Sequence, residues 1–367
     1  MKLILLLSFL SGFAHAYVAT PDVIYDEING VKLGMDVFTP SNPGMWLRPA
    51  LVFIHGGCFS MGSRKDIPEE MKQLADEGFT VFSLSYRLSP VAKYPAAMKD
   101  IQQAIRFIRK NSLTYKIDPL RMIVHGESAG GTLAAYLGLR PVTNREGKID
   151  LLSFRVPYVS EWFGRMDFTA SQSTGEDCAE SFLGLKRGPE TMDAFKQASP
   201  LSYIDDRSAE FFIIHGTSDQ QVYPIHSAMI ANKLWSVGKK AELYFNENQP
   251  HGFDRRLPWI LTKNRILAFA GKANKAKAHS PYHEVKFTLH ERTPVSGKFD
   301  LNLILGLGPK TTVLSKAGSD IFSSGSFTGS FGVISRSKKI DLKLESFTRQ
   351  NETEFVDLES SGLKIAR

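Results

Sequence analysis

The sequence predicts an α/β fold with a mainly parallel sheet and helices on both faces, followed by a small C-terminal all-β domain. Between residues 51 and 270, short apolar runs alternate with segments of helical periodicity. Strands separated by helices connect through right-handed crossovers, which produce a parallel sheet covered on both faces. From residue 282 onward the chain is rich in serine, glycine and threonine, and apolar residues alternate with polar ones as in half-buried antiparallel strands.

The first expected element is an antiparallel hairpin, after which strands and helices follow in turn. The hairpin covers 23–25 and 32–37, because Asn29 and Gly30 suit the tight turn that joins two twisted strands. The other expected elements are a strand at 51–54, a helix at 68–77, a strand at 81–86, a helix at 97–109 and a last helix at 259–270. Such a fold gathers functional side chains at the carboxyl ends of its strands.

The chain is predicted to have four parts. They are a signal peptide at 1–16, a main domain at 17–271, a lysine- and alanine-rich linker at 272–281 and the all-β accessory domain at 282–367. Lys2 before an apolar run, and the small residues Ala14 and Ala16 before the cleavage site, indicate the signal peptide. We therefore expect export to the periplasm or the medium. The accessory domain is expected either to stabilise the main domain or to contact a glycan or a cell surface.

The composition excludes several classes of function. Of the 367 residues, 43% are hydrophobic and 23% are charged, which is ordinary for a globular protein. The net charge of +7 is dispersed along the chain, so no nucleic-acid-binding surface is indicated. His226, His279, His283 and His290 have no spacing typical of metal ligands, and we expect neither a metal ion nor a cofactor.

One segment has the layout of a turn that presents a nucleophile. An apolar run ends at Gly126, and beyond Ser128 and Gly130 the chain continues as a helix. The flanking glycines allow a sharp turn from strand to helix without a Cβ clash. The start of the helix offers its free N–H groups to a developing negative charge. Ser128 is therefore the candidate nucleophile.

The sequence also contains the groups that a nucleophilic serine needs, namely a base, an acid that orients the base, and donors for the oxyanion. Gly56 and Gly57 follow the strand at 51–54, separated from it only by His55. Asp219 follows a later apolar run, and His251 lies in a loop beyond the next one. The chain order of serine, acid and histidine differs from the orders found in the chymotrypsin and subtilisin folds.

On these motifs the sequence resembles the α/β-hydrolase superfamily. Within it, the sequence is similar to the esterase branch with an HGG oxyanion motif, which includes feruloyl-esterase-like and acetyl-xylan-esterase-like carbohydrate esterases. The resemblance covers residues 22–270. The motifs that carry it are His55-Gly56-Gly57, Gly126-Glu127-Ser128-Ala129-Gly130, 85–88 with 94–96, 117–119, 162–164 with Asp167, 182–184 and 198–200.

The resemblance implies a mainly parallel α/β-hydrolase sheet and a serine esterase that works through an acyl-enzyme and needs no cofactor. The implied substrate is a short-chain or carbohydrate-linked ester. The implied catalytic residues are Ser128, Asp219 and His251, and the implied oxyanion hole consists of the backbone N–H groups of Gly56, Gly57 and Ala129. The hairpin starts directly after the predicted cleavage site, so we expect no N-terminal helical cap over the pocket and a preference for short acyl groups.

Cys58 departs from the usual motif, because it replaces the third glycine of HGGG. It has two interpretations. Cys58 is either a small buried filler behind the oxyanion loop or the partner of Cys178 in a disulfide that ties an insertion over the site.

Three alternative functions compete with ester hydrolysis. A formamidase-like amide hydrolase keeps the HGG motif. A prolyl-oligopeptidase-like serine peptidase shares the elbow and the chain order, although it lacks the HGG loop and brings a large extra domain. A non-catalytic binding scaffold would have lost a member of the triad. Structural or solvated roles, rather than catalytic ones, are expected for His55, Glu127, His125, His215, Asp205 and Asp206.

Overall fold

The structure is a computed structural model that describes 17–42, 44, 46–139, 154–169 and 177–271 with their side chains, and only the backbone of strands between 282 and 359. The signal peptide predicted at 1–16 and the linker predicted at 272–281 lie outside the described residues. Within the described part, no helix has the length and apolar character required to cross a bilayer.

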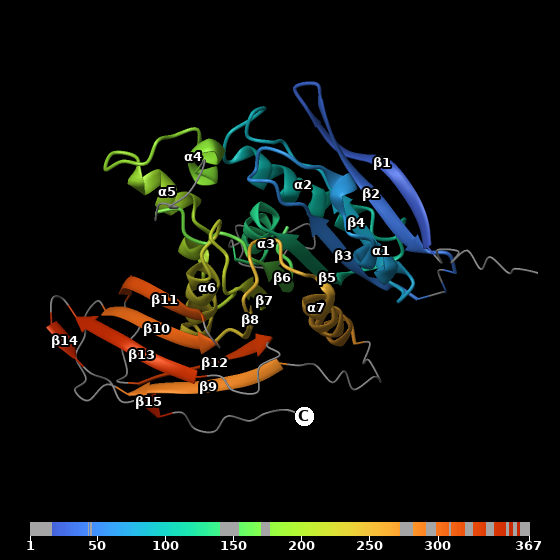
Figure 1. Cartoon of the computed structure of the whole chain (residues 1–367). Coiled ribbons are helices and arrows are strands. Elements are labelled where there is room, and N and C mark those ends of the chain that lie inside the picture. The colour runs from blue at the N-terminus through green and yellow to red at the C-terminus, as the bar shows by residue number, and fades with distance from the viewer. Residues whose placement is uncertain are drawn as a thin grey trace, which may run out of the picture.

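The main part of the chain is built on a sheet in which most strands are parallel (Figure 1). Its strands are β1 (Tyr17–Ile28), β2 (Val31–Pro40), β3 (Arg48–Ile54), β4 (Thr80–Leu84), β5 (Ile117–Glu127), β6 (Tyr158–Trp162), β7 (Glu210–Gly216) and β8 (Ala241–Asn246). Their order is β1-β2-β4-β3-β5-β6-β7-β8. The strands from β4 to β8 pair in parallel, whereas β1 and β2 are antiparallel at one edge. The prediction of a mainly parallel sheet is confirmed.

The helices cover both faces of the sheet, as predicted. They are α1 (Glu69–Lys72), α2 (Ala96–Lys110), α3 (Ala129–Leu139), α4 (Cys178–Leu183), α5 (Met192–Ala198), α6 (Ile225–Ser236) and α7 (Arg256–Phe269). One core cluster contains buried residues of α2, α3 and α6, and a second contains those of α1 and α7. The helix expected at 68–77 is a single α-helical turn continued by a 3-10 turn, because Gly78 has a φ of +83° and leads the chain directly into β4.

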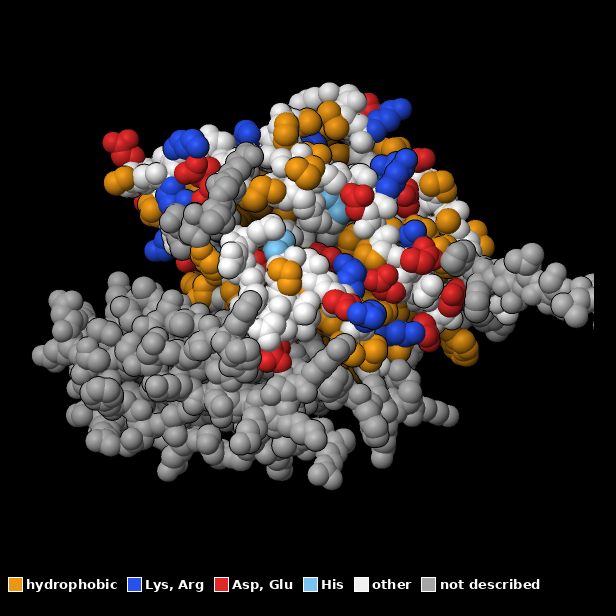
Figure 2. All heavy atoms as spheres, viewed as in Figure 1, with side chains coloured by type: hydrophobic (Ala, Val, Ile, Leu, Met, Phe, Trp, Pro, Cys, Tyr) orange, Lys and Arg blue, Asp and Glu red, His pale blue; other side chains and the backbone are white. Residues whose placement is uncertain are grey.

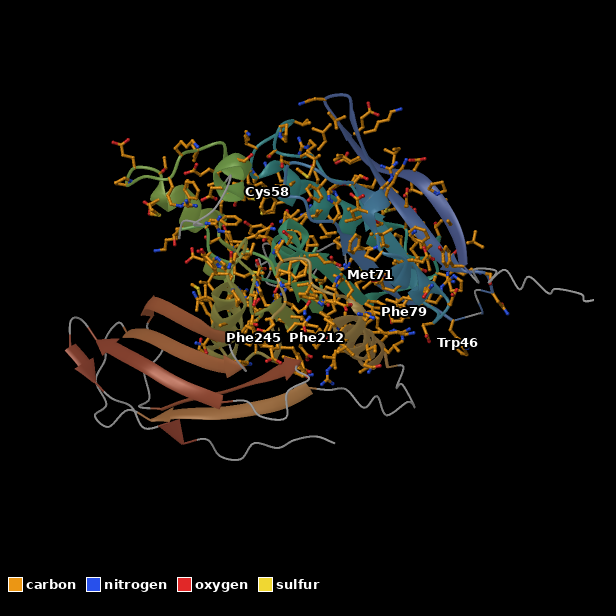
Figure 3. All side chains as sticks on the ribbon, viewed as in Figure 1. Trp46, Cys58, Met71, Phe79, Phe212 and Phe245 are labelled. Atoms are coloured by element: carbon orange, nitrogen blue, oxygen red, sulfur yellow. A yellow bond between two sulfur atoms is a disulfide. The ribbon has the colours of Figure 1, made fainter. Side chains whose placement is uncertain are left out.

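The central strands are apolar on both sides because helices cover both of their faces. Phe212 on β7 belongs to the cluster of α1 and α7, together with Met71 and Phe79. Phe245 on β8 belongs to the cluster of α2, α3 and α6. Figure 3 labels these four side chains inside the body of the protein. The alternation of side chains along each strand thus divides the core into two layers.

The hairpin at the edge of the sheet has the predicted turn. Asn29 and Gly30 join β1 to β2 with φ values of +51° and +78°. Two successive positive φ values match the right-handed twist of the strands that flank such a turn. The hairpin prediction is confirmed.

The backbone beyond residue 282 forms strands, in agreement with the alternating pattern of the sequence. They are β9 (Tyr282–His290), β10 (Phe299–Leu307), β11 (Lys310–Ser319), β12 (Ser326–Ile334), β13 (Asp341–Arg349), β14 (Glu352–Glu354) and β15 (Leu358–Glu359). β12 pairs with β8 in parallel, and β9 and β15 continue that sheet. A second sheet has the order β11-β10-β13-β14. The separate domain at 282–367 stays a prediction.

The charged side chains on the face drawn in Figure 2 are mixed in sign. Lys and Arg of the described residues are interspersed with Asp and Glu there. This distribution agrees with the dispersed charge expected from the sequence.

Candidate active site

Ser128 occupies a strained turn between β5 and α3. Its φ is +54°, in the left-handed region that non-glycine residues rarely adopt. A Cβ on Gly126 would lie 2.1 Å from the carbonyl oxygen of Gly130, and a Cβ on Gly130 would lie 2.1 Å from that of Ile54. Any larger residue at either glycine would therefore force α3 away from the sheet. The turn has the geometry that the sequence predicts for a nucleophile elbow.

The structure brings the predicted serine, histidine and acid together from three separate strand ends. Nε2 of His251 lies 2.9 Å from Oγ of Ser128, and Nδ1 of His251 lies 2.7 Å from Oδ2 of Asp219. The carboxylate of Asp219 is fully buried, whereas 14% of the His251 side chain is exposed. The arrangement can pass the hydroxyl proton of Ser128 to an imidazole that a carboxylate holds in place.

Groups other than His251 also hold the carboxylate of Asp219. The backbone N–H groups of Gln221 and Val222 both donate to its Oδ1 at 2.9 Å. Nε2 of His215 lies 3.1 Å from Oδ2, the oxygen that also contacts His251. Burial acts to raise the pKa of Asp219, but hydrogen bonds from His215 and His251 outweigh it and hold the pKa well below its usual range. The acid is therefore ionised at neutral pH.

His215 also supports Asp219, although the sequence predicted only a structural role for this histidine. Its Nδ1 lies 2.7 Å from Oγ of Ser227, which fixes the ring. The sequence signal for this supporting role is that Asp219 follows His215 by four residues.

The oxyanion loop has an unusual backbone. Gly57, Cys58 and Phe59 have successive φ values of +105°, +52° and +58°. A Cβ on Gly57 would lie 2.3 Å from the carbonyl oxygen of Met61, so only glycine fits there. Ala129 begins α3, and its N–H belongs to the first turn, where donors have no partner within the helix.

The predicted residues line one pocket of about 670 Å³. The pocket contains Ser128 and His251, while the buried Asp219 lies behind the histidine. The lining residues are Gly56, Gly57, Cys58, Phe59, Met61, Glu127, Ser128, Ala129, Thr132, Phe163, Arg165, Cys178, Gln221, Val222, His251 and Gly252. The residues that carry the three predicted oxyanion donors thus border the same pocket as the nucleophile.

Cys58 forms a disulfide with Cys178, with their Cα atoms 5.1 Å apart. The interpretation of Cys58 as a small buried filler is therefore wrong, and the alternative of a bridge over the site is correct. The sequence left this question open because the two cysteines are 120 residues apart, and only the folded chain brings α4 next to the oxyanion loop.

Glu127 points away from the reacting groups and supports the elbow, as expected. Its Oε2 accepts a hydrogen bond of 2.6 Å from Arg255, and its Oε1 lies 3.3 Å from Nε2 of His125. Burial acts to raise the pKa of Glu127, but the hydrogen bonds from His125 and Arg255 lower it to about 2. Arg255 also packs over the ring of Trp162 and pairs with Glu70. The ion pair between Arg255 and Glu127 therefore ties the start of α7 to the elbow.

The other residues expected to have structural or solvated roles do not touch the nucleophile. His55 stacks on Tyr86 with ring centroids 4.4 Å apart, and Asp205 pairs with exposed Arg207 at 2.8 Å. Among the residues with described side chains, no group of three His, Cys, Asp or Glu could hold a metal ion.

Glu161 is a buried carboxyl that no motif in the sequence indicates. It lies on β6 under the elbow, and its Oε1 accepts a hydrogen bond from the N–H of Gly164. The same oxygen would be 2.9 Å from a Cβ on Gly131 of α3. Its Oε2 has no hydrogen-bonding partner among the described residues. Burial raises the pKa of Glu161 to about 8, so the carboxyl is protonated at neutral pH.

The geometry defines an α/β-hydrolase, since the sheet order, the elbow and the serine, histidine and acid occur together. The chain belongs to the BD-FAE family, an α/β-hydrolase esterase family whose model matches residues 35–234, more than half of the chain.

Curated relatives and solved structures agree with this assignment. The esterase LipQ of Mycobacterium tuberculosis is 28% identical over 212 residues, covering 56% of this chain and 50% of LipQ. The probable isoprenylcysteine alpha-carbonyl methylesterase ICMEL1 of Oryza sativa subsp. japonica is 26% identical over 243 residues, covering 62% of this chain and 56% of ICMEL1. The chain thus spans about half the length of these relatives. A truncated carbohydrate esterase from gut microbiota is similar in structure, with a TM-score of 0.60 and 25% identity over 71% of this chain and 99% of that one.

Glu161→Gln should make stability less sensitive to alkaline pH. The folded protein keeps a proton on Glu161, whereas the unfolded chain releases this proton above the ordinary pKa of 4.5. The wild type therefore loses stability as the pH rises from about 5 to 8, by up to about 1.4 kcal/mol per pH unit. Below this window both states are protonated, and above it the loss is constant. Urea unfolding of both proteins at several pH values should show a difference that grows with pH in favour of the variant.

The matched control is the same change at exposed Glu190, measured in parallel. A difference between wild type and Glu161→Gln that stays constant from pH 5 to 8 would show that Glu161 is ionised in the folded protein.

Proposed function

We propose that the protein is a serine carboxylic-ester hydrolase. The observation that carries the proposal is the continuous contact from Asp219 through His251 to Ser128, with distances of 2.7 and 2.9 Å, at the wall of a pocket. Membership of an esterase family and the esterase names of the relatives support the same reaction class.

The reaction proceeds through an acyl-enzyme. Oγ of Ser128 attacks the ester carbonyl while Nε2 of His251 takes its proton, and Asp219 stabilises the imidazolium that forms. His251 then gives the proton to the departing alcohol. Water attacks the acyl-enzyme with His251 again as base, which returns the serine to its starting state.

The tetrahedral oxyanion is bound by the backbone N–H groups of Gly56, Gly57 and Ala129. Each such donor contributes about 3 kcal/mol to transition-state stabilisation in serine hydrolases of this kind. The positive φ of Gly57 and the position of Ala129 at the start of α3 support this assignment.

Short-chain or carbohydrate-linked esters are the proposed substrates. The pocket of about 670 Å³ is bounded by the disulfide and by apolar side chains such as Met61 and Phe163. The similar gut enzyme is named a carbohydrate esterase, which supports a carbohydrate-linked ester as the substrate.

Substitution of the triad tests the mechanism. Ser128→Ala and His251→Ala should each lower kcat on p-nitrophenyl acetate by at least about a thousandfold, and Asp219→Asn by less, because the acid acts only through the histidine. Circular dichroism should stay unchanged, since the elbow glycines remain.

Asp205→Asn is the matched control and should keep the wild-type rate, because Asp205 pairs with Arg207 at the surface. The assignment of the nucleophile fails if folded Ser128→Ala keeps a rate within about tenfold of the wild type.

A panel of esters tests the substrate class. Acetyl and butyryl esters of p-nitrophenol should have kcat/KM values at least about tenfold above those of decanoyl and longer esters, because we expect no N-terminal cap to supply an extended apolar tunnel for a long acyl chain. Acetylated and feruloylated sugars and p-nitroanilides complete the panel. A preference for chains of ten carbons or more, or amides cleaved faster than the matching esters, would contradict the proposal.

We propose further that the protein is exported with removal of residues 1–16, and that residues 282–367 form an accessory domain joined by the linker at 272–281. Lys2, Ala14 and Ala16 and the change of composition after residue 271 support these proposals.

Mass spectrometry and brief proteolysis test both ends of the chain. Protein recovered from the periplasm or the medium should begin at Tyr17, and a short protease treatment should cut within 272–281 and leave a fragment active on p-nitrophenyl acetate. A retained N-terminus would refute the export signal. Loss of activity on cleavage would show that the C-terminal strands belong to the catalytic fold.

A further inference from the structure

The oxyanion loop is tied covalently to a helix that follows it by 120 residues. Cys58 lies in the loop, Cys178 begins α4, and both line the pocket. Figure 3 labels Cys58 beside this helix. The chain contains only these two cysteines, so every thiol or disulfide effect in the protein belongs to this pair.

The backbone of the loop needs such a support. Cys58 and Phe59 are not glycines, yet both have positive φ values, a conformation that persists only where the surroundings enforce it. Phe59 is held by contact, because its ring stacks on Phe182 of α4 at 4.0 Å. Cys58 is held by its bond to Cys178.

α4 is itself anchored firmly, so it can act as the fixed side of this link. Asp177 caps the helix by accepting a hydrogen bond from Ala179. Its carboxylate also pairs with Arg165 at 2.8 Å and with Arg187 at 2.6 Å. These contacts hold the N-terminal end of α4, where Cys178 lies.

The other end of α4 is anchored to the chain that follows β4. The carbonyl oxygen of Phe182 accepts a hydrogen bond of 2.8 Å from the N–H of Tyr94, and that of Ser181 accepts one of 3.0 Å from Lys93. Neither of these bonds passes through the disulfide. Cleavage of the disulfide would therefore leave α4 in place and remove the covalent tie of Cys58, while the stacking of Phe59 on Phe182 remains.

We propose that Cys58 and Cys178 are a positioning pair, whose disulfide holds the oxyanion loop in its donor-presenting conformation and whose reduction slows the chemical step without unfolding the protein. The proposal rests on the proposed esterase function. When Cys58 is released, its positive φ loses its covalent support, and the N–H of the neighbouring Gly57 is no longer tied to α4, although the carbonyl oxygen of Gly57 still accepts hydrogen bonds from Ser60 and Met61. The triad, which lies on other strand ends, is left intact.

The reductant is a dithiol. One of its thiolates attacks a sulfur of the pair and forms a mixed disulfide, and its second thiolate then displaces the protein sulfur. Two electrons and two protons pass to the protein, the bond between the two sulfurs breaks, and Cys58 and Cys178 become thiols while the dithiol becomes a disulfide. A disulfide oxidant reverses the exchange.

Reduction of the folded enzyme tests the proposal. The full chain is treated with dithiothreitol, and the two new thiols are counted by maleimide labelling and mass spectrometry. The dithiothreitol is removed in the absence of air before the assay, because free thiols cleave p-nitrophenyl esters. We expect kcat on p-nitrophenyl acetate to fall about tenfold or more, since displaced oxyanion donors cost rate, with KM changed by less than about twofold. Reoxidation should restore kcat, and circular dichroism should not change.

The variant with both Cys58→Ser and Cys178→Ser is the matched control. It should have the low kcat of the reduced wild type and should not respond to dithiothreitol, because no other cysteine is present. A fully reduced wild type that keeps kcat within about twofold overturns the proposal. Unfolding on reduction also overturns it, since the disulfide would then support the whole fold and not the loop.

Hydrogen exchange separates this proposal from the proposed function. Reduction should speed exchange in peptides that cover 55–62 and leave β5 protected. If the oxidised protein hydrolyses no ester, the esterase function fails, whereas faster exchange confined to the loop still supports the positioning role. Unchanged exchange in 55–62 after complete reduction refutes the role of the pair.

Discussion

The close approach of β5, α3 and β3 around Ser128 is the constraint on which the rest of the site depends. Gly126 and Gly130 leave no space for a Cβ, and Ser128 adopts a φ of +54° between them. The backbone of the elbow is held from the next strand as well, because the N–H of Ser128 donates to the carbonyl oxygen of Trp162. The strand ends that carry the other groups converge on this point, so the position of one serine sets the distances available to the base and the oxyanion donors.

Three carboxyls around the elbow have three different environments, and their charge states follow from their donors and their burial. Asp219 receives backbone and imidazole hydrogen bonds, and Glu127 receives a guanidinium, so both are ionised. Glu161 accepts one backbone N–H, and burial keeps it protonated. Only Asp219 contacts the base directly. The negative charge that stabilises an imidazolium is thereby placed behind the histidine, while the carboxyl under the elbow stays neutral.

The parts of this molecule that local pattern controls could be predicted from the sequence. The Asn29-Gly30 hairpin, the alternation of strands and helices, and the elbow glycines each depend on the φ values or periodicity of a few neighbouring residues. The disulfide and the burial of Glu161 could not be predicted, because each depends on contacts between segments far apart in the chain. The proximity of Ser128, Asp219 and His251 could be predicted for a different reason. Each follows a strand of a parallel sheet, and parallel strands bring their carboxyl ends to one edge whatever the sequence between them.

The two halves of the site are supported in different ways. The predicted nucleophile, acid and base follow β5, β7 and β8. The pairing of β5 with β6 continues up to Glu127, and that of β7 with β8 ends at Gly216 and Asn246, three residues before Asp219 and five before His251. The oxyanion loop follows β3 but turns away through three residues with positive φ, and α4 reaches it from the segment between β6 and β7. Interactions within the sheet therefore position the predicted nucleophile, acid and base, whereas contacts with α4 add support to the loop that carries Gly56 and Gly57. The two halves meet at Gly56, where an added Cβ would lie 2.9 Å from the carbonyl oxygen of Glu127 and 3.3 Å from the Cβ of Ser128, so the loop has little room to move toward the elbow.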